Sequence, residues 1–196
     1  MTPYDPLHPK LGMDESPNQL IGETRKPYRD SKGVLREDFE YVREGVASVF
    51  MATEPLTGAM VVEAKESHNT KDWVMFIHMV MLRYPDALTV TFVLDNLSTH
   101  KPSAFYDFFP PEVAKALLDR LRFVFTPKHG SWLNMAEIAL HVLNKQCLSK
   151  RMPDIEAMRE HIAFWEKDKA AKRKPIHWQF GIEEARVKLA RLYPKI

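Results

Sequence analysis

Three carboxylates have the placement expected of a catalytic cluster. Asp95 closes the apolar run of residues 91–94. A buried strand that ends in an Asp delivers a charge to the carboxyl edge of the sheet, where open α/β sheets build their sites. Asp14, upstream, and Glu137, downstream, are its expected partners. Three carboxylates brought together would suit divalent-metal phosphoryl chemistry.

The residues after Asp95 strengthen this interpretation. An Asp at a strand end can also simply cap a turn through its own backbone, and that alternative stays open. However, Asn96, Ser98, Thr99 and His100 follow within five residues. Such a polar cluster at the mouth of a buried strand is what a ligand crevice needs.

Glu137 and Asp14 are each open to a second interpretation. Asn134 and Glu137 have the spacing of a capping box at a helix start. Glu137 also shares one helical face with Asn134, His141 and Asn144, a polar ridge that could line a cleft. Asp14 follows few apolar residues and could belong to an exposed acidic pair.

The ligand types favour a hard cation. Carboxylate oxygens without a thiolate cluster suit Mg²⁺ or Mn²⁺, and two ions could activate a water or 3′-hydroxyl and stabilise the leaving oxygen. The histidines lack the H-E-x-x-H spacing of a zinc site. Lys128 and His129 could contact a phosphate, although the same residues would also fit an ordinary surface loop.

Composition predicts one soluble domain. The 196 residues are 45% hydrophobic and 28% charged, which is ordinary for a globular protein. Cys147 is the single cysteine, so we expect no disulfide framework, no zinc cluster and a reducing compartment. No run reaches membrane-spanning length, and residues 1–6 lack signal-peptide features. The net charge is +2, with nine basic against five acidic residues between Lys145 and Lys174. That stretch could follow phosphates or be a solvated helix face.

The elements that would position these residues follow from periodicity and turn signals. We expect an extended lead-in over 1–12 with at most a short strand, then a loop over 22–43. The predicted strands are 46–52, 59–64, 88–95 and 121–125, and the predicted helices are 71–84, 110–120, 133–148, 154–169 and 182–192. This order indicates an α/β protein with a mixed sheet and helices around it.

The acidic residues lie in recognisable blocks. Residues 13–15, 94–100 and 126–137 resemble the three acidic blocks of DDE transposases, with the bacterial insertion-sequence relatives of the mariner superfamily as the nearest branch. Residues 154–168, 178–180 and 185–194 resemble that family's C-terminal end. The resemblance therefore covers nearly the whole chain.

The resemblance implies a ribonuclease-H-like fold, a mixed β-sheet flanked by helices. It implies Asp14, Asp95 and Glu137 as ligands of Mg²⁺ or Mn²⁺, and cut-and-paste DNA transposition by strand cleavage and joining. Expected partners are transposon-end DNA, target DNA and a second copy in a homodimeric active complex, in the bacterial cytoplasm with the nucleoid. Asn96, His100, Lys128 and His129 would orient the substrate.

The chain departs from the family pattern at its start. Only about a dozen residues precede Asp14, so we expect no helix-turn-helix DNA-binding module, and the first strand is poorer in apolar residues than the family's. We expect a single catalytic domain over 1–196, with a C-terminal helical extension over 155–196. Two alternatives stay open: a non-catalytic or truncated remnant that binds DNA or intact transposase, and a general ribonuclease-H-like nuclease.

Overall fold

A mixed five-stranded sheet forms the centre of the protein. The structure is a computed structural model, and it describes residues 4–36, 38–127, 134–175, 184, 186–187 and 190. The strand order is β5-β4-β1-β6-β7. The central pairs β1–β4 and β4–β5 are antiparallel, whereas β1–β6 and β6–β7 are parallel. The bounds are Lys10–Glu23 for β1, Tyr41–Glu54 for β4, Ala59–Lys65 for β5, Val90–Leu94 for β6 and Leu121–Phe125 for β7.

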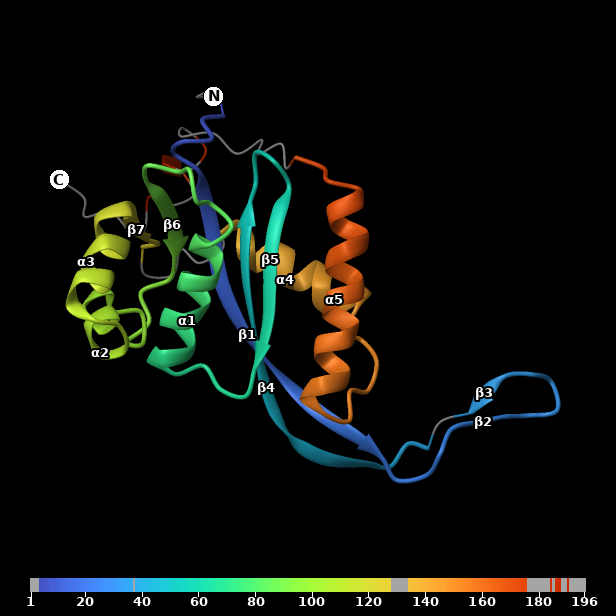
Figure 1. Cartoon of the computed structure of the whole chain (residues 1–196). Coiled ribbons are helices and arrows are strands. Elements are labelled where there is room, and N and C mark those ends of the chain that lie inside the picture. The colour runs from blue at the N-terminus through green and yellow to red at the C-terminus, as the bar shows by residue number, and fades with distance from the viewer. Residues whose placement is uncertain are drawn as a thin grey trace.

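Helices cover both faces of this sheet (Figure 1). Their bounds are Thr70–Met81 for α1, Phe105–Phe108 for α2, Pro111–Arg120 for α3, Met135–Gln146 for α4 and Ile155–Ala171 for α5, with a 3₁₀ turn at Pro102–Ala104. The predicted α/β class, a mixed sheet flanked by helices, is therefore confirmed. No helix within the described ranges is long and apolar enough to cross a bilayer.

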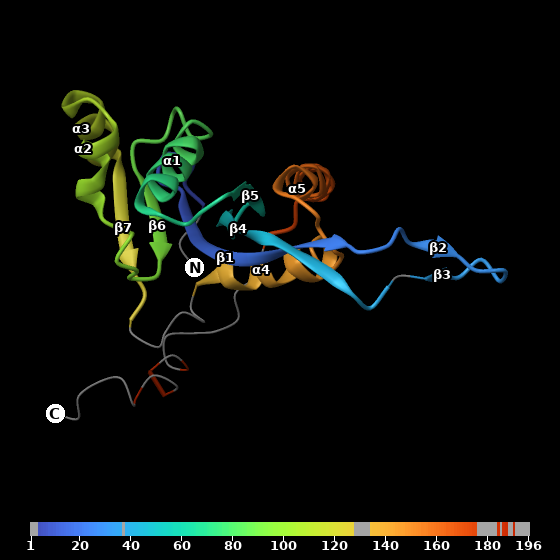
Figure 2. The same cartoon turned by 90° about the horizontal axis from the view of Figure 1, so that it is seen from below.

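Alternation of side chains along the strands separates two apolar cores. On one face, Leu11 and Met13 of β1 pack with Phe92 of β6 and with Trp73 and Phe76 of α1. On the other face the strands pack against α4 and α5, through a cluster that includes Val49, Met51, Leu140, Leu143 and Met158. Figure 2 shows α1 and α4 on opposite sides of the sheet. Consecutive side chains of β1 therefore point to opposite faces of the sheet, one toward α1 and the other toward α4.

The first strand differs most from the sequence-based expectation. Residues 1–12 were expected to hold at most a short strand, whereas β1 runs from Lys10 to Glu23 through a polar segment that includes Pro17. The reason is tertiary, because β1 pairs with β4 along almost its whole length, from Gly12 with Thr53 to Glu23 with Tyr41. Pairing to a long partner outweighs the weak strand propensity of this segment.

The other elements agree with the prediction more closely. Strand β7 has the predicted bounds, and Asn69 is the N-cap of α1, accepting from the Asp72 amide. The sequence missed the short α2. The predicted helix over 182–192 falls largely outside the described residues.

A two-stranded ribbon, the arm, extends beyond the body of the protein from the ends of β1 and β4 (Figure 1). The pairing shifts between Leu20 and Ile21, opposite Gly45, whose φ of 125° few residues other than glycine adopt. The tip carries two short strands, β2 at Tyr28–Arg29 and β3 at Leu35–Arg36. This segment was predicted to be a loop.

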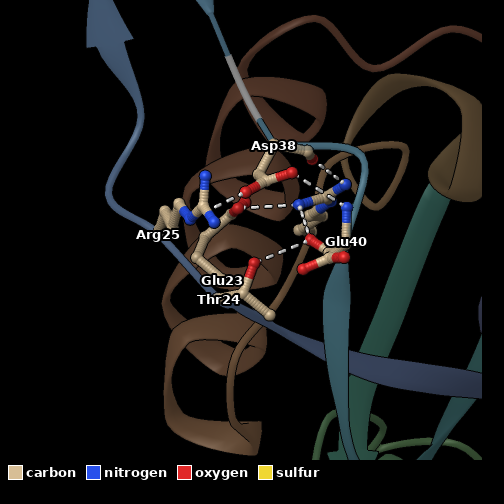
Figure 3. Close-up of polar contacts among 6 residues, drawn as sticks. Glu23, Thr24, Arg25, Asp38 and Glu40 are labelled. Carbon is tan, nitrogen blue, oxygen red and sulfur yellow. Dashed lines mark hydrogen bonds and ion pairs between the residues drawn. The ribbon is translucent and has the colours of Figure 1, made fainter.

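Polar contacts hold the base of this arm (Figure 3). Arg25 Nε lies 3.4 Å from Asp38 Oδ2, and the Thr24 hydroxyl donates to the Glu40 carbonyl. Arg151, in the loop between α4 and α5, lies 2.7 Å from Glu23 Oε2 and donates to the Asp38 carbonyl. One arginine thus connects the end of β1 and the segment before β4 to the loop between α4 and α5.

Candidate active site

Strand register places two of the predicted carboxylates beside each other. The parallel pairing of β1 with β6 ends at Gly12 with Val93. Asp14 and Asp95 each follow this last pair by two residues, so they lie on the same face of the sheet as Gly12 and Val93. The pairing stops here because β6 ends at Leu94, and both carboxylates come directly after the last pair.

The start of α4 is held against the same face. A Cβ at Gly12 would lie 2.8 Å from Asn134 Oδ1 and 3.1 Å from the Ala136 nitrogen, so only glycine allows this approach. Asn134 is the N-cap of α4 and also donates from Nδ2 to the Met13 carbonyl at 2.7 Å. Glu137 lies in the first turn of α4, with an exposed side chain. The helix start therefore brings Glu137 to the side of the sheet where Asp14 lies.

The charges of these residues interact. Burial raises the pKa of Asp14 to about 6, and the nearby carboxylates of Asp95, Glu15 and Glu137 add to the rise. A hydrogen bond from the Glu15 amide to Asp14 Oδ1, 2.9 Å long, partly opposes it. Like charges raise an acid's pKa when they are close together and lack a cation. Asp95 and Glu137 therefore lie close enough to Asp14 to disfavour its charged form.

Asp14, Asp95 and Glu137 all offer carboxylate oxygens, which are the ligands that hard divalent cations prefer. Within the described ranges, however, no three His, Cys, Asp or Glu side chains are close enough together to hold a metal ion. Repulsion among carboxylates would keep them apart without a cation. Closure of Glu137 onto Asp14 and Asp95 would be needed to complete a three-carboxylate site.

A buried histidine, His100, contacts Asp95. His100 Nδ1 is 3.1 Å from the Asp95 main-chain oxygen and 3.2 Å from Oδ1, whereas Nε2 is 3.2 Å from Glu15 Oε2. The ring stacks on Trp73 with centroids 5.2 Å apart. Burial alone would lower the pKa of His100, but the carboxylates of Asp95 and Glu15 outweigh it and raise the pKa to about 9.

The predicted substrate-orienting residues lie in different settings. The His100 side chain has no exposed area, so in this structure it contacts carboxylates rather than solvent, and any effect on substrate would be indirect. Asn96 is exposed directly after Asp95, where a substrate could reach it. Lys128 and His129 lie outside the described residues.

Sequence reasoning missed the part played by Glu15. This residue was interpreted with Asp14 as a possible exposed pair, yet its side chain is 6% exposed. A local signal existed, because Leu11, Met13 and Glu15 alternate on one strand face and the first two are apolar. An acid that continues an apolar face is expected to be buried with a partner. That the partner is His100 could not be deduced, because 85 residues separate the two.

The sequence matches the family described as DDE superfamily endonuclease over residues 11–159. This match covers most of the chain and includes all three predicted carboxylates. The chain belongs to the DDE superfamily endonucleases. A search of curated proteins gives no match.

Several solved structures are similar to this chain at low sequence identity. The simian T-cell lymphotropic virus intasome in complex with the PP2A regulatory subunit B56 gamma shares 9% identity over 80% of this chain and 48% of that chain, with a TM-score of 0.48. The dimeric HTLV-2 integrase catalytic core domain in complex with magnesium shares 13% identity over 80% and 83%, with a TM-score of 0.43. A pre-cleavage Mos1 transpososome shares 14% identity over 87% and 58%, with a TM-score of 0.41. The chain thus spans about half the length of the first and the third.

Proposed function

We propose that this chain is the metal-dependent catalytic core of an insertion-sequence transposase, which cleaves DNA strands and joins them to a target. The observation that carries the proposal is the position of Asp14 beside Asp95 where the pairing of β1 with β6 ends, with Glu137 close enough to add to the raised pKa of Asp14. Membership of the DDE superfamily endonucleases supports the same chemistry.

In this proposal Asp14, Asp95 and Glu137 bind Mg²⁺ or Mn²⁺, with two ions as the expected number. Bound ions would supply an activated water or 3′-hydroxyl nucleophile and stabilisation of the leaving oxygen. The exposed Asn96 would contact the DNA backbone, and Lys128 and His129 are proposed for the same role. Substrates would be transposon-end and target DNA in the bacterial nucleoid, handled by a homodimer. The proposed unit is one catalytic domain over 1–196, with residues 155–196 as its C-terminal extension.

A plasmid assay tests the reaction class. Supercoiled plasmid and an oligonucleotide with a free 3′-hydroxyl would be incubated with the full chain and Mg²⁺ or Mn²⁺. We expect nicking of the plasmid and joining of the oligonucleotide to it. Asp95→Asn should abolish both. Asp119→Asn is the matched control, because it removes an exposed acid on α3 and should change neither.

The outcomes separate the proposal from its alternatives. Nicking that persists in Asp95→Asn would contradict the assignment of this carboxylate. Nicking without joining would favour a general ribonuclease-H-like nuclease. Binding of the DNA by the wild-type chain with neither reaction would favour a non-catalytic remnant.

A further inference from the structure

We propose that Glu15 and His100 form a buried pair that positions the Asp95 carboxylate, so that Glu15 is a further residue on which the metal site depends. The inference rests on the proposed function, because it takes Asp95 as a metal ligand. It adds to the site a residue on the opposite face of the sheet from Asp14.

The first step is the placement of Glu15. Successive side chains of a strand point to opposite faces, so Asp14 faces α4 while Glu15 points to the face that carries Leu11 and Met13. A carboxylate buried on a core face is unfavourable unless a partner compensates it. One of its oxygens, Oε1, is buried with no hydrogen-bond partner among the described residues. The other, Oε2, contacts His100.

The second step is the proton arrangement that these contacts require. A main-chain carbonyl can only accept a hydrogen bond, so His100 Nδ1 must carry a hydrogen where it faces the Asp95 carbonyl. At the other end of the ring, Nε2 and Glu15 Oε2 must share a second proton across 3.2 Å. Rotation of the ring would break both contacts. Glu15 therefore fixes the orientation of the imidazole, and stacking on Trp73 restricts it further.

The third step leads from the ring to the metal ligand. The hydrogen bond of His100 Nδ1 goes to the Asp95 main-chain oxygen, and Asp95 Oδ1, 3.2 Å from the same nitrogen, is a buried oxygen in charge contact with the ring that has no hydrogen-bond partner among the described residues. No other basic side chain in the described part of the chain forms an ion pair with Asp95. The Asp95 side chain is 30% exposed although its Oδ1 is buried, so the ring contacts the buried oxygen and the rest of the carboxylate stays accessible. Partners that orient ligating groups typically change metal affinity by about 10–100-fold when they are removed.

The test compares the affinity of the full chain for Mn²⁺ alone, measured by electron paramagnetic resonance. We expect Glu15→Ala to weaken Mn²⁺ binding by about 10–100-fold. Glu15→Gln should weaken it less, because the amide oxygen can still accept from His100 Nε2. Glu54→Gln and Glu54→Ala are the matched controls. Glu54 is another buried glutamate of the same sheet, the last residue of β4, and its side chain contacts Thr57 and Tyr84 rather than His100 or Asp95. These variants should lower stability without lowering Mn²⁺ affinity.

A second measurement avoids dependence on a substitution that could unfold the protein. Nitrogen–proton correlation spectra of the wild-type imidazoles should show a hydrogen on His100 Nδ1, the nitrogen that faces the Asp95 carbonyl, and the His100 signals should shift on titration with Mg²⁺. Wild-type affinity for Mn²⁺ in folded Glu15→Ala, or His100 signals unmoved by saturating Mg²⁺, would overturn the role of Glu15 and His100 but leave the proposed metal site in place. A wild-type chain that binds no Mn²⁺ would overturn the proposed metal site and this inference with it.

Discussion

Asn134 Nδ2 donates to the main-chain oxygen of Met13 at 2.7 Å, a buried contact between residues 121 positions apart. The same side chain accepts from the Ala136 amide at 3.1 Å and so caps α4. One residue thus caps α4 and attaches its first turn to Met13, the residue before Asp14. The position of Glu137 relative to Asp14 depends on this contact.

Replacing Asn134 by Ser should separate these two functions. Ser can still cap the helix, but it is too short to reach Met13, whose carbonyl would lose its side-chain donor. We expect a loss of about 1–3 kcal/mol in the free energy of unfolding, because an unsatisfied buried acceptor is unfavourable. Asn134→Ala should lose about 1 kcal/mol more with the cap. Urea unfolding of the three proteins measures both steps, and equal stability of Asn134→Ser and wild type would refute the role of this contact.

Asp14 should make the metal-free protein less stable as pH rises. Its pKa is higher in the folded chain than in the unfolded one, so the folded state holds this proton more tightly and loses relative stability between about pH 4 and pH 6. A rise from 3.8 to about 6 corresponds to about 2–3 kcal/mol. Asp14→Asn should therefore be more stable than wild type by about that amount at pH 8, and no more stable below pH 4.

Mg²⁺ should reverse this difference. The ion would compensate the carboxylates of the wild type and stabilise its fold, whereas Asp14→Asn lacks one ligand. Thermal melts at pH 4 and pH 8, with and without Mg²⁺, measure all four conditions. Lower stability of Asp14→Asn at pH 8 in the absence of metal would show that no electrostatic strain is stored at this position.

Arg151 should control the order of the projecting arm. Its guanidinium contacts Glu23 on one strand and the Asp38 and Glu40 carbonyls on the other. Arg151→Ala should lower stability by about 1–2 kcal/mol through the loss of charge-assisted hydrogen bonds. Amide hydrogen exchange should speed up in residues 24–36 and stay unchanged in α1. The control is Arg159→Ala, since Arg159 contacts Ala64 and Glu156 rather than the arm. Faster exchange in both variants alike would mean that Arg151 has no specific role there.

Elements defined by local signals could be predicted from the sequence. Strand β7 combines an apolar run with a helix before it and Pro127 after it, and its predicted bounds are confirmed. The N-cap at Asn69 was likewise recognisable from residue type and position. In contrast, β1 could not be predicted at its full length, because its polar stretch is extended only through pairing with β4.

In the candidate site, too, some features follow from local sequence signals and others depend on long-range contacts. The Asp95 position follows from the strand that precedes it, and its polar neighbours are visible in the sequence. The close approach of α4 requires Gly12 and Asn134, which no local pattern connects. The burial of His100 between Glu15 and Asp95 also depends on long-range pairing, so the sequence indicated a polar cluster without showing which members face the core.

Anomalous diffraction from crystals soaked in Mn²⁺ would show whether Asp14, Asp95 and Glu137 together bind divalent metal. We expect Mn²⁺ bound by Asp14 and Asp95 where the pairing of β1 with β6 ends, with Glu137 drawn toward the metal from the first turn of α4. Crystals of Asp95→Asn grown in the same way should lose this density. Mn²⁺ bound only at other residues, or no Mn²⁺ at a saturating concentration, would show that these three carboxylates do not form the metal site.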